Sequence, residues 1–230
     1  MSTAQAVAPT RQHLTLSGSS LLVRDFFCYS LQSILYQRAL YPPEDFKAVR
    51  KYGLQMLVAI DDALATYIDA AMRQLAAWLE QGAVSRVVVA IVDTETGDTV
   101  ERWQFDVDVV GEAVAESKLA KEEKKPVPPK ASAANSGTYG AKTDAHVKAE
   151  IAAIIKQITA SCTFLPMLEQ QCSFSILAYT STSTPIPLEW AESSARLISE
   201  GEAEQVRLRS FSTHVHRVDA MVAYRRGEDE

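Results

Sequence analysis

Residues 144–180 constrain the fold more than any other stretch, because an amphipathic helix pattern leads there into an alternating strand pattern. Apolar residues recur at three- and four-residue spacing in the first half, which places them on one face of a helix. These residues are Val147, Ile151, Ile154, Ile155 and Ile158. Asp144 is the expected N-cap, and Pro166 prevents the helix from continuing much beyond Thr163.

Residues 172–180 alternate in the way that a half-buried strand does. One face carries Phe174, Ile176 and Ala178, and the other carries Ser173, Ser175, Leu177 and Tyr179. A helix with an apolar face and a half-buried strand can bury each other. The stretch therefore predicts an α+β fold with helices on one side of a sheet.

An N-terminal helix is predicted well before this stretch. Leu14 and Leu16 indicate a short strand, after which Ser19 or Ser20 caps a helix that runs to about Arg38. The apolar face of this helix consists of Leu22, Phe26, Phe27, Leu31, Ile34 and Leu35.

A second helix begins at Asp61 or Asp62, and Gly82 occupies the left-handed position that ends it. Its apolar residues are Leu64, Tyr67, Ile68, Ala71, Met72, Leu75, Trp78 and Leu79. The apolar run 54–60 just before it is short, so its type stays open.

The next two segments predict an antiparallel hairpin. Residues 84–92 are almost continuously apolar after Arg86, as in a strand that is covered on both faces. Residues 94–98, with Gly97, form the turn. The return strand alternates Trp103, Phe105, Val107 and Val109 with Arg102, Gln104, Asp106 and Asp108. We expect the face with the polar set to be wet.

Residues 111–143 are rich in Ala, Lys, Glu, Pro, Ser and Gly, and positions 121–130 read KEEKKPVPPK. Such a segment cannot bury enough apolar surface to offset its ordering entropy. We expect a disordered loop that is dispensable for folding, inside one domain that spans 1–230 with its core at 14–224. Two domains joined by a linker are the alternative.

The C-terminal residues 206–224 have the pattern of a long strand whose alternation changes phase. Phe211, Thr213 and Val215 share one register, whereas Val218, Val222 and Tyr224 share the other. A slip of one residue moves every side chain to the opposite face of a sheet. The pattern predicts a bulge or bend near His216 and Arg217, or a tail that can pair in more than one way.

Nothing in the sequence indicates an enzyme. The chain lacks phosphate-binding, dinucleotide-binding, hydrolase and zinc-protease motifs. His214 and His216 lack a third nearby metal ligand, and Cys28 and Cys172 lie in apolar segments where thiols are structural. Asp61 and Asp62 fit a helix start better than an acid/base pair. We therefore expect no catalytic residue, no metal and no cofactor.

Charge and targeting patterns exclude other classes. The net charge of −6 argues against nonspecific nucleic-acid binding. We expect no signal peptide, because the N-terminus lacks the basic-then-apolar pattern of one. We expect no insertion into a membrane, because no apolar run reaches membrane-spanning length. Three cysteines without CxxC spacing favour a reducing compartment.

Seven blocks of sequence resemble the mitotic-arrest-deficient, spindle-assembly-checkpoint branch of the HORMA-domain family. They are 33–38 (SILYQR), 51–54 (KYGL), 101–106 (ERWQFD), 157–160 (QITA), 163–166 (TFLP), 206–211 (VRLRSF) and 221–224 (MVAY). The resemblance covers 14–224 apart from the loop 111–143. It implies three main helices packed against a mainly antiparallel sheet, with a mobile C-terminal segment called the safety belt.

The resemblance also implies a function. Family members add a short segment of a partner to a sheet edge as an extra strand, and then wrap the belt around it. They switch between an open state, in which the tail covers that edge, and a closed state, in which the tail lies across the sheet. For this chain it implies a checkpoint protein that captures and inhibits the activator subunit of the anaphase-promoting complex.

Three sets of site residues follow from family positions. The partner edge comprises Ser173, Phe174, Ser175, Ile176, Leu177, Ala178, Tyr179 and Thr180. The belt covers 181–224 and includes Trp190, Arg207, Arg209, Phe211, Met221, Val222 and Tyr224. The surface where open and closed copies dimerise includes Arg38, Glu101, Lys156, Gln157, Thr163 and Phe164. Lys156 replaces the arginine usual in the family, and a lysine keeps the charge but loses the planar fork of donors.

The implied partners are a kinetochore receptor of the checkpoint, the activator subunit, a second copy of the chain in the other state, and an AAA+ remodelling ATPase with its adaptor. The implied locations are the nucleus, unattached kinetochores and the cytoplasm. Another HORMA adaptor, such as the polymerase-zeta accessory subunit or a meiotic axis protein, is the alternative function. A Cys/His hydrolase that uses Cys28 or Cys172 is a more distant alternative.

Overall fold

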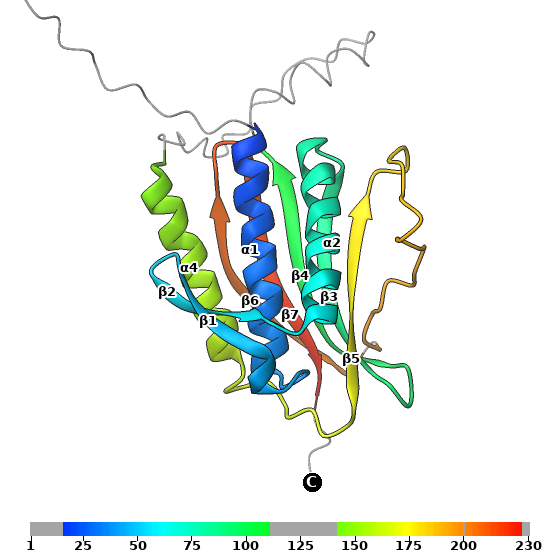
Figure 1. The fold of residues 1–230 in the computed structure, drawn as a ribbon. Helices are drawn as coiled ribbons and strands as arrows, with labels where there is room; N and C mark the ends of the chain where they lie inside the picture. The colour runs from blue at the N-terminus through cyan, green and yellow to red at the C-terminus, as the bar shows by residue number, and fades with distance from the viewer. Residues whose placement is uncertain (1–15, 111–141, 200, 227–230) are drawn as a thin grey trace, which may run out of the picture.

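Helices cover one face of a five-stranded antiparallel sheet in the computed structural model, which describes residues 16–110, 142–199 and 201–226 (Figure 1). The helices are α1 (Leu16–Gln37), α2 (Asp62–Glu80) and α4 (Asp144–Ser161), with a short 3-10 turn at Pro43–Asp45. The strands are β1 (Phe46–Lys51), β2 (Leu54–Ala59), β3 (Val84–Asp93), β4 (Thr99–Val109), β5 (Cys172–Thr180), β6 (Ala203–Ser212) and β7 (His216–Arg225). The predicted fold class is confirmed.

The order of the main sheet is β5-β3-β4-β7-β6, and every neighbouring pair is antiparallel. The C-terminal hairpin β6–β7 therefore lies beside β4, and β5 lies at the opposite edge. A separate two-stranded sheet, β1–β2, crosses in front of α1 (Figure 1). The apolar run 54–60, whose type the sequence left open, thus forms strand β2, and its partner β1 was not predicted.

Helix α1 is covered on two sides, which explains why so few of its residues are exposed. Its inner face packs on the sheet, where the Phe26 ring lies 5.6 Å from that of Phe105 and 4.9 Å from that of Phe211. On the outer side, the side-chain oxygen of Gln32 accepts a 2.8 Å hydrogen bond from the amide of Ala59 in β2. The buried Gln32 thus has its polar group satisfied by the backbone of the hairpin.

The start of α1 corrects two predictions. Leu16 begins the helix instead of a strand, and Leu14 lies outside the described residues. Ser19 and Ser20 are interior helix residues with no exposed surface, so neither is the N-cap. Ser19 instead hydrogen-bonds to Thr213 and His216 at the tip of the C-terminal hairpin. A serine can form a cap or a tertiary hydrogen bond, and here the tertiary partner decides.

Both ends of α2 match the prediction. The carboxylate of Asp61 accepts a 2.8 Å hydrogen bond from the amide of Leu64 and caps the first turn. At the other end Gly82 has φ of 61°, and its amide donates to the carbonyl of Leu79. The amide of Ala83 donates to the carbonyl of Trp78, which completes a Schellman motif.

The cap of α4 is Thr143 and not Asp144. The hydroxyl of Thr143 accepts from the amide of His146 at 3.3 Å, while Asp144 is the first helical residue. Most of the predicted loop, 111–141, lies outside the described residues. Its last two residues are ordered, because Lys142 and Thr143 both contact α4.

The β3–β4 hairpin forms as predicted, but its second face is less wet than expected. Arg102 and Gln104 are 6% and 8% exposed. Arg102 hydrogen-bonds to Gln104 and, at 3.3 Å, to the hydroxyl of Tyr179 in β5. Long polar side chains that pair along a sheet cover the strand between them, and Val88 in β3 is fully buried there.

The change of phase in the C-terminal segment marks a hairpin turn. Strand β6 ends at Ser212 and β7 begins at His216, with the amide of Thr213 donating to the carbonyl of His216 at 2.7 Å. The predicted single strand with a bulge or bend near His216 is therefore wrong. The two registers belong to two antiparallel strands, and Phe211 faces Val218 directly across them. A separate register shift lies between Arg207 and Ser210.

A buried ion pair joins the end of α1 to β4. Nε of Arg38 lies 2.8 Å from Glu101, and the two side chains are 6% and 1% exposed. The indole of Trp103 also donates to Glu101, and Arg38 donates to the carbonyl of Pro166. Burial raises the pKa of Glu101, and the guanidinium of Arg38 opposes that rise. The pair fixes the C-terminal end of α1 against the sheet and the α4–β5 connection.

Removal of one member of this pair is predicted to destabilise the fold strongly. Glu101→Ala leaves a buried guanidinium without its counterion, which costs about 3–5 kcal/mol of unfolding free energy. The control is Asp69→Ala, which breaks an exposed ion pair with Arg73 and is expected to cost less than about 1 kcal/mol. Urea unfolding followed by circular dichroism measures both, and equal losses would contradict the prediction.

Candidate functional site

Strand β5 presents an unpaired edge. It pairs with β3 along its whole length, from Thr180 opposite Val84 to Cys172 opposite Asp93. Within the described ranges no strand pairs with its other side. An unpaired edge exposes a row of backbone donors and acceptors, which is a template for an added strand.

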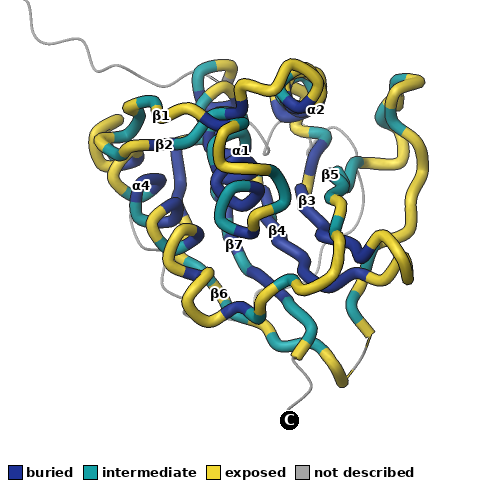
Figure 2. Tube along the Cα trace, turned by 60° about the horizontal axis from the view of Figure 1, so that its bottom comes forward, coloured by how far each residue is buried: buried dark blue, intermediate teal, exposed yellow. Residues whose placement is uncertain are grey.

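A groove of about 1000 Å³ lies along this edge. Residues 175–180 of β5 form one wall, and α2 contributes Tyr67, Arg73 and Trp78. The remaining wall is the coil that follows β5, with lining residues between Ile186 and Ala195. Figure 1 shows this coil, residues 181–199, running alongside β5 on the side away from β3, and Figure 2 shows that it is largely exposed.

A contact between two indoles fastens the coil over the groove. The rings of Trp78 and Trp190 lie 4.9 Å apart at 69°, an edge-to-face arrangement. Trp78 is 3% exposed and held by the core, whereas Trp190 is half-buried. Further along the coil, the guanidinium of Arg196 donates to the carbonyl of Gly97 in the β3–β4 turn. The coil is thus attached to α2 and to the main sheet, with the groove between them.

The groove combines an apolar base with a charged rim. Ile176 is buried, and the ring of Tyr67 lies 5.7 Å from that of Phe174. Burial raises the pKa of Tyr67, so its hydroxyl remains a donor. Arg73 lies on the helix side of the rim, and Glu189 is one of the acidic residues of the coil. This arrangement suits an extended peptide, whose backbone pairs with β5 and whose alternate side chains enter the groove.

The thiols of Cys28 and Cys172 do not line the groove. Burial raises the pKa of both Cys28 and Cys172, which disfavours their thiolates. The described part of the chain holds no cluster of three or more potential metal ligands and no helix able to span a membrane. His214 is exposed and His216 is buried, so the two histidines do not share one strand face.

The structure places the eight residues expected at the partner edge together on β5. The belt residues are distributed over separate elements: Trp190 lies in the coil, Arg207, Arg209 and Phe211 lie in β6, and Met221, Val222 and Tyr224 lie in β7. Only Trp190 among them lines the groove. Phe211 and Val222 are core residues, at 1% and 0% exposure.

The residues expected at the dimer surface separate into two groups. Lys156, Thr163 and Phe164 are exposed at the C-terminal end of α4 and just beyond it, and Gln157 is half-buried beside them. Arg38 and Glu101 form the buried ion pair described above, so they are not surface residues in this conformation. Their charges satisfy each other inside the protein, so their assignment to the dimer surface stays a prediction.

The sequence reasoning missed most of the groove. Tyr67 and Trp78 were identified only as part of the apolar face of α2, because a residue that lines a groove has the same helical spacing as one in the core. Glu189 lies in a coil without periodicity. Only the alternation in β5 gave a signal, and alternation does not reveal which strand lies at an edge.

Comparisons with known proteins agree with this fold. Residues 19–216 match the model of the HORMA domain. The mitotic spindle checkpoint component mad2 of Schizosaccharomyces pombe is 41% identical, with 94% of this chain and 97% of that protein covered. The human mitotic spindle assembly checkpoint protein MAD2A is also 41% identical, with 93% and 94% covered. A chain in a crystal structure of the mitotic checkpoint complex superposes with a TM-score of 0.75 at 40% identity, covering 91% of this chain and all of that one.

Other branches of the family are more distant. The DNA polymerase zeta processivity subunit of S. pombe is 25% identical over 73% of this chain and 71% of its own length. Caenorhabditis elegans HTP-2 bound to a closure motif of HIM-3 has a TM-score of 0.69 at 12% identity, with 91% of each chain covered, which shows the fold alone. The family match and the high identity over nearly whole chains agree: this chain belongs to the HORMA-domain family, within its spindle-checkpoint branch.

Proposed function

We propose that this protein captures an extended segment of a partner on the free edge of β5 and encloses it under the coil 181–199. The observation that carries this proposal is the groove between β5, α2 and the coil, closed by the Trp78–Trp190 contact. Backbone pairing along β5 would supply affinity, and the groove would select side chains. Enclosure slows escape more than it changes encounter, so the affinity resides mainly in the dissociation rate.

The position of the C-terminal hairpin supports a closed, capture-competent conformation. Hairpin β6–β7 pairs with β4, and its strands lie on the opposite side of the sheet from β5. The tail therefore leaves the β5 edge free, as expected of a closed state. In the open state expected from the family, the same tail would occupy the β5 edge and compete with the partner.

The cellular role follows from the branch of the family. A checkpoint protein of this kind acts at unattached kinetochores, where a receptor-bound closed copy converts the open form. The closed form then captures and inhibits the activator subunit of the anaphase-promoting complex, and an AAA+ ATPase with its adaptor restores the open form. Nucleus and cytoplasm are the compartments that these partners require. No step in this role calls for catalysis or a cofactor.

The first prediction from this proposal concerns closure of the coil. Trp190→Ala removes the edge-to-face contact with Trp78, which is worth about 0.5–1.5 kcal/mol beyond buried area. Dissociation of captured peptide should accelerate roughly threefold to tenfold, with little change in association. Overlapping fluorescein-labelled peptides from the activator subunit, followed by anisotropy after addition of unlabelled competitor, measure both rates.

The matched control for Trp190→Ala is Leu188→Ala. Leu188 lies two residues away on the same coil and is fully exposed, at 102%. Its removal should leave both rates unchanged. Equal dissociation from the Trp190→Ala and unmodified proteins would contradict enclosure by the coil, and absence of binding to any peptide from the activator would contradict the proposed partner.

The second prediction concerns pairing of open and closed copies. Lys156 is exposed on α4, on the side away from the buried Ile154 and Ile155. Lys156→Glu replaces a positive charge by a negative one in the expected dimer contact. Loss of the charge that the partner group requires costs about 2–5 kcal/mol of association free energy. Analytical ultracentrifugation of mixed open and closed protein should show loss of the dimer.

Two measurements separate this effect from damage elsewhere. The unfolding free energy of the Lys156→Glu protein should change by less than about 0.5 kcal/mol, because the position is exposed. Peptide capture at β5 should persist, because α4 contacts β6 and β6 is the edge strand opposite β5. An unchanged dimer would mean that Lys156 is a solvated residue only, and loss of capture as well would mean that the two surfaces are not separable.

A further inference from the structure

We propose that Gln157 and Glu150 of α4, with Lys142 just before it, are positioning residues that hold β6 in the closed arrangement by binding its edge. We call these three residues the clasp. The proposal deepens the peptide-capture function, because it identifies what keeps the tail away from β5.

Strand β6 is the second edge of the sheet, and α4 satisfies part of that edge with side chains. The amide of Arg209 donates to the side-chain oxygen of Gln157 at 2.7 Å. The amide of Ser212 donates to the carboxylate of Glu150 at 3.3 Å. Both donors are main-chain amides, and Arg209 lies in the register shift of β6, where it has no direct partner in β7. Helix α4 thus occupies part of the place that a sixth strand would take.

The spacing of donors and acceptors matches along the two elements. Gln157 and Glu150 are seven residues apart, which is about 10 Å along a helix. Arg209 and Ser212 are three residues apart, which is about 10 Å along a strand. The two hydrogen bonds therefore fix both the position and the antiparallel direction of β6 beside α4.

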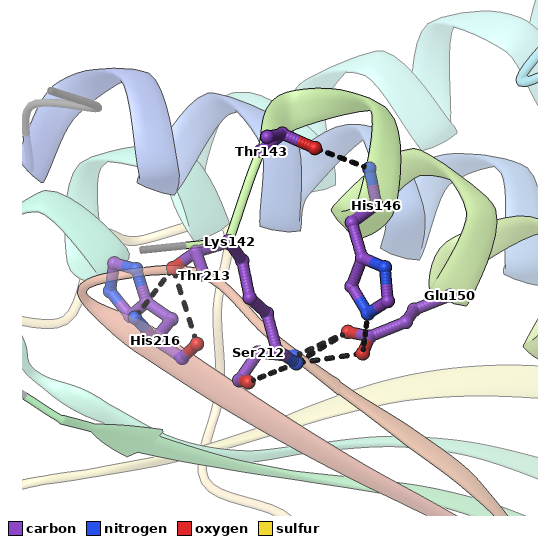
Figure 3. A network of polar contacts seen from close by, with 7 residues as sticks. All are labelled: Lys142, Thr143, His146, Glu150, Ser212, Thr213 and His216. Atoms are coloured by element: carbon purple, nitrogen blue, oxygen red, sulfur yellow. Dashed lines mark hydrogen bonds and ion pairs between the residues drawn. The ribbon is translucent and has the colours of Figure 1, made fainter. Parts of the chain in front are cut away.

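Lys142 holds the end of the clasp that lies near the N-terminus of α4. Its ammonium lies 2.7 and 2.9 Å from the two oxygens of Glu150 and 2.8 Å from the hydroxyl of Ser212 (Figure 3). His146 approaches the same carboxylate at 3.2 Å from one turn of α4 away. The Glu150 carboxylate is thus held by Lys142 and His146 where it meets β6.

The adjacent turn of the hairpin is attached to α1. The hydroxyl of Ser19 lies 2.7 Å from both Thr213 Oγ1 and His216 Nδ1, and all three groups are buried. Figure 3 shows the Lys142–Glu150–Ser212 contacts directly beside Thr213 and His216. Two independent polar attachments, one from α4 and one from α1, therefore meet at the tip of β6–β7.

Two of the clasp contacts recognise a position of the backbone and not a side chain. Gln157 and Glu150 bind the backbone amides of Arg209 and Ser212, and Lys142 adds a contact with the hydroxyl of Ser212, so all three form only when β6 lies beside α4. In the open arrangement the tail lies at the β5 edge, on the other side of the five-stranded sheet, and these bonds are absent. An interaction present in only one of two states changes their ratio by its full free energy.

The clasp also connects the tail to the expected dimer surface. Gln157 follows Lys156 on α4, and its side-chain oxygen is already committed to Arg209. A second copy that docks on Lys156 and Phe164 lies beside this bond and can strengthen or release it. Position of the tail and occupancy of the dimer surface are then linked through one residue.

The test replaces the acceptor without changing the size of the side chain. Gln157→Met removes the oxygen, and Gln157→Glu keeps an acceptor at the same place. Hydrogen exchange of the full chain, resolved to residues by NMR, should show the amides of β6 exchanging about fivefold faster in Gln157→Met, as for loss of one hydrogen bond. Amides of β4 next to β3 should be unchanged, and Gln157→Glu should restore protection. Lys148→Met, on the exposed side of α4, should have no effect.

A second measurement follows the two conformers directly. With 5-fluorotryptophan at Trp78, Trp103 and Trp190, we expect the open and closed forms to give separate fluorine signals, because Trp190 lies in the coil that covers the β5 edge. The closed fraction relative to the open one should fall about fivefold in Gln157→Met and recover in Gln157→Glu. Unchanged exchange in β6 for Gln157→Met, or an equal effect of Lys148→Met, would overturn the proposal. Failure of peptide capture in the unmodified protein would refute the proposed function alone, because exchange in β6 does not depend on a peptide.

Discussion

The two edges of an open antiparallel sheet must each be satisfied, and this requirement organises the whole protein. Backbone groups at an edge either find partners or invite a further strand. At β6 the partners are side chains of α4, so that edge is partly closed from within the chain. At β5 the edge is left unpaired beneath a coil, with a groove of about 1000 Å³ next to it. The asymmetry between the two edges makes β5 the place where a second polypeptide can enter.

Helix α1 provides the rigid reference for both edges. It lies between the main sheet and the β1–β2 hairpin, and its Phe26, Leu31, Ile34 and Leu35 are nearly completely buried. Its N-terminal end contacts the tip of the C-terminal hairpin through Ser19, and its C-terminal end is joined to β4 by the buried Arg38–Glu101 pair. A tail that changes position must therefore break contacts with an element that itself cannot easily move.

Sequence patterns predicted the elements whose burial has a single direction. The 3.6-residue spacing of α2 and α4 reflects one buried face, and it agrees with the structure except at Tyr67, which is 47% exposed. The alternation in β4 and β5 predicted two strands, but the second face of β4 is buried as well and both faces of β5 are partly covered. The caps differ in how well they could be predicted. Asp61 and Gly82 have partners nearby in the sequence. Ser19 has partners nearly two hundred residues away, and Ser20 is fully buried, and no local pattern shows either fact.

The failures share a physical cause, because each depends on a contact between distant segments. The change of phase near His216 is equally consistent with a bulge and with a hairpin turn, and only the pairing of Phe211 with Val218 distinguishes them. Family position assigned Arg38 and Glu101 to the dimer surface, and the sequence does not show that the two charges meet in a buried pair. The groove is hidden because Tyr67 and Trp78 have the spacing of core residues. Family resemblance placed the edge on β5, which residue patterns alone could not do.

In the conformational switch proposed above, a balance between two positions of the tail explains why a few polar contacts can matter. The inner face of β6–β7 buries Phe211, Val218 and Val222 against the helices, and an apolar face of this kind would also be buried if the hairpin paired at the other edge. Apolar burial is non-directional, so it favours both positions by similar amounts and largely cancels in the difference. Hydrogen bonds with fixed geometry do not cancel, because α4 offers Gln157 and Glu150 at only one of the two edges. Each contributes little to the total stability of the protein, yet a factor of five in the ratio of two folded states requires only about 1 kcal/mol. We therefore propose that directional contacts at the edge of the sheet decide the position of the tail, while the core supplies the stability that both positions share.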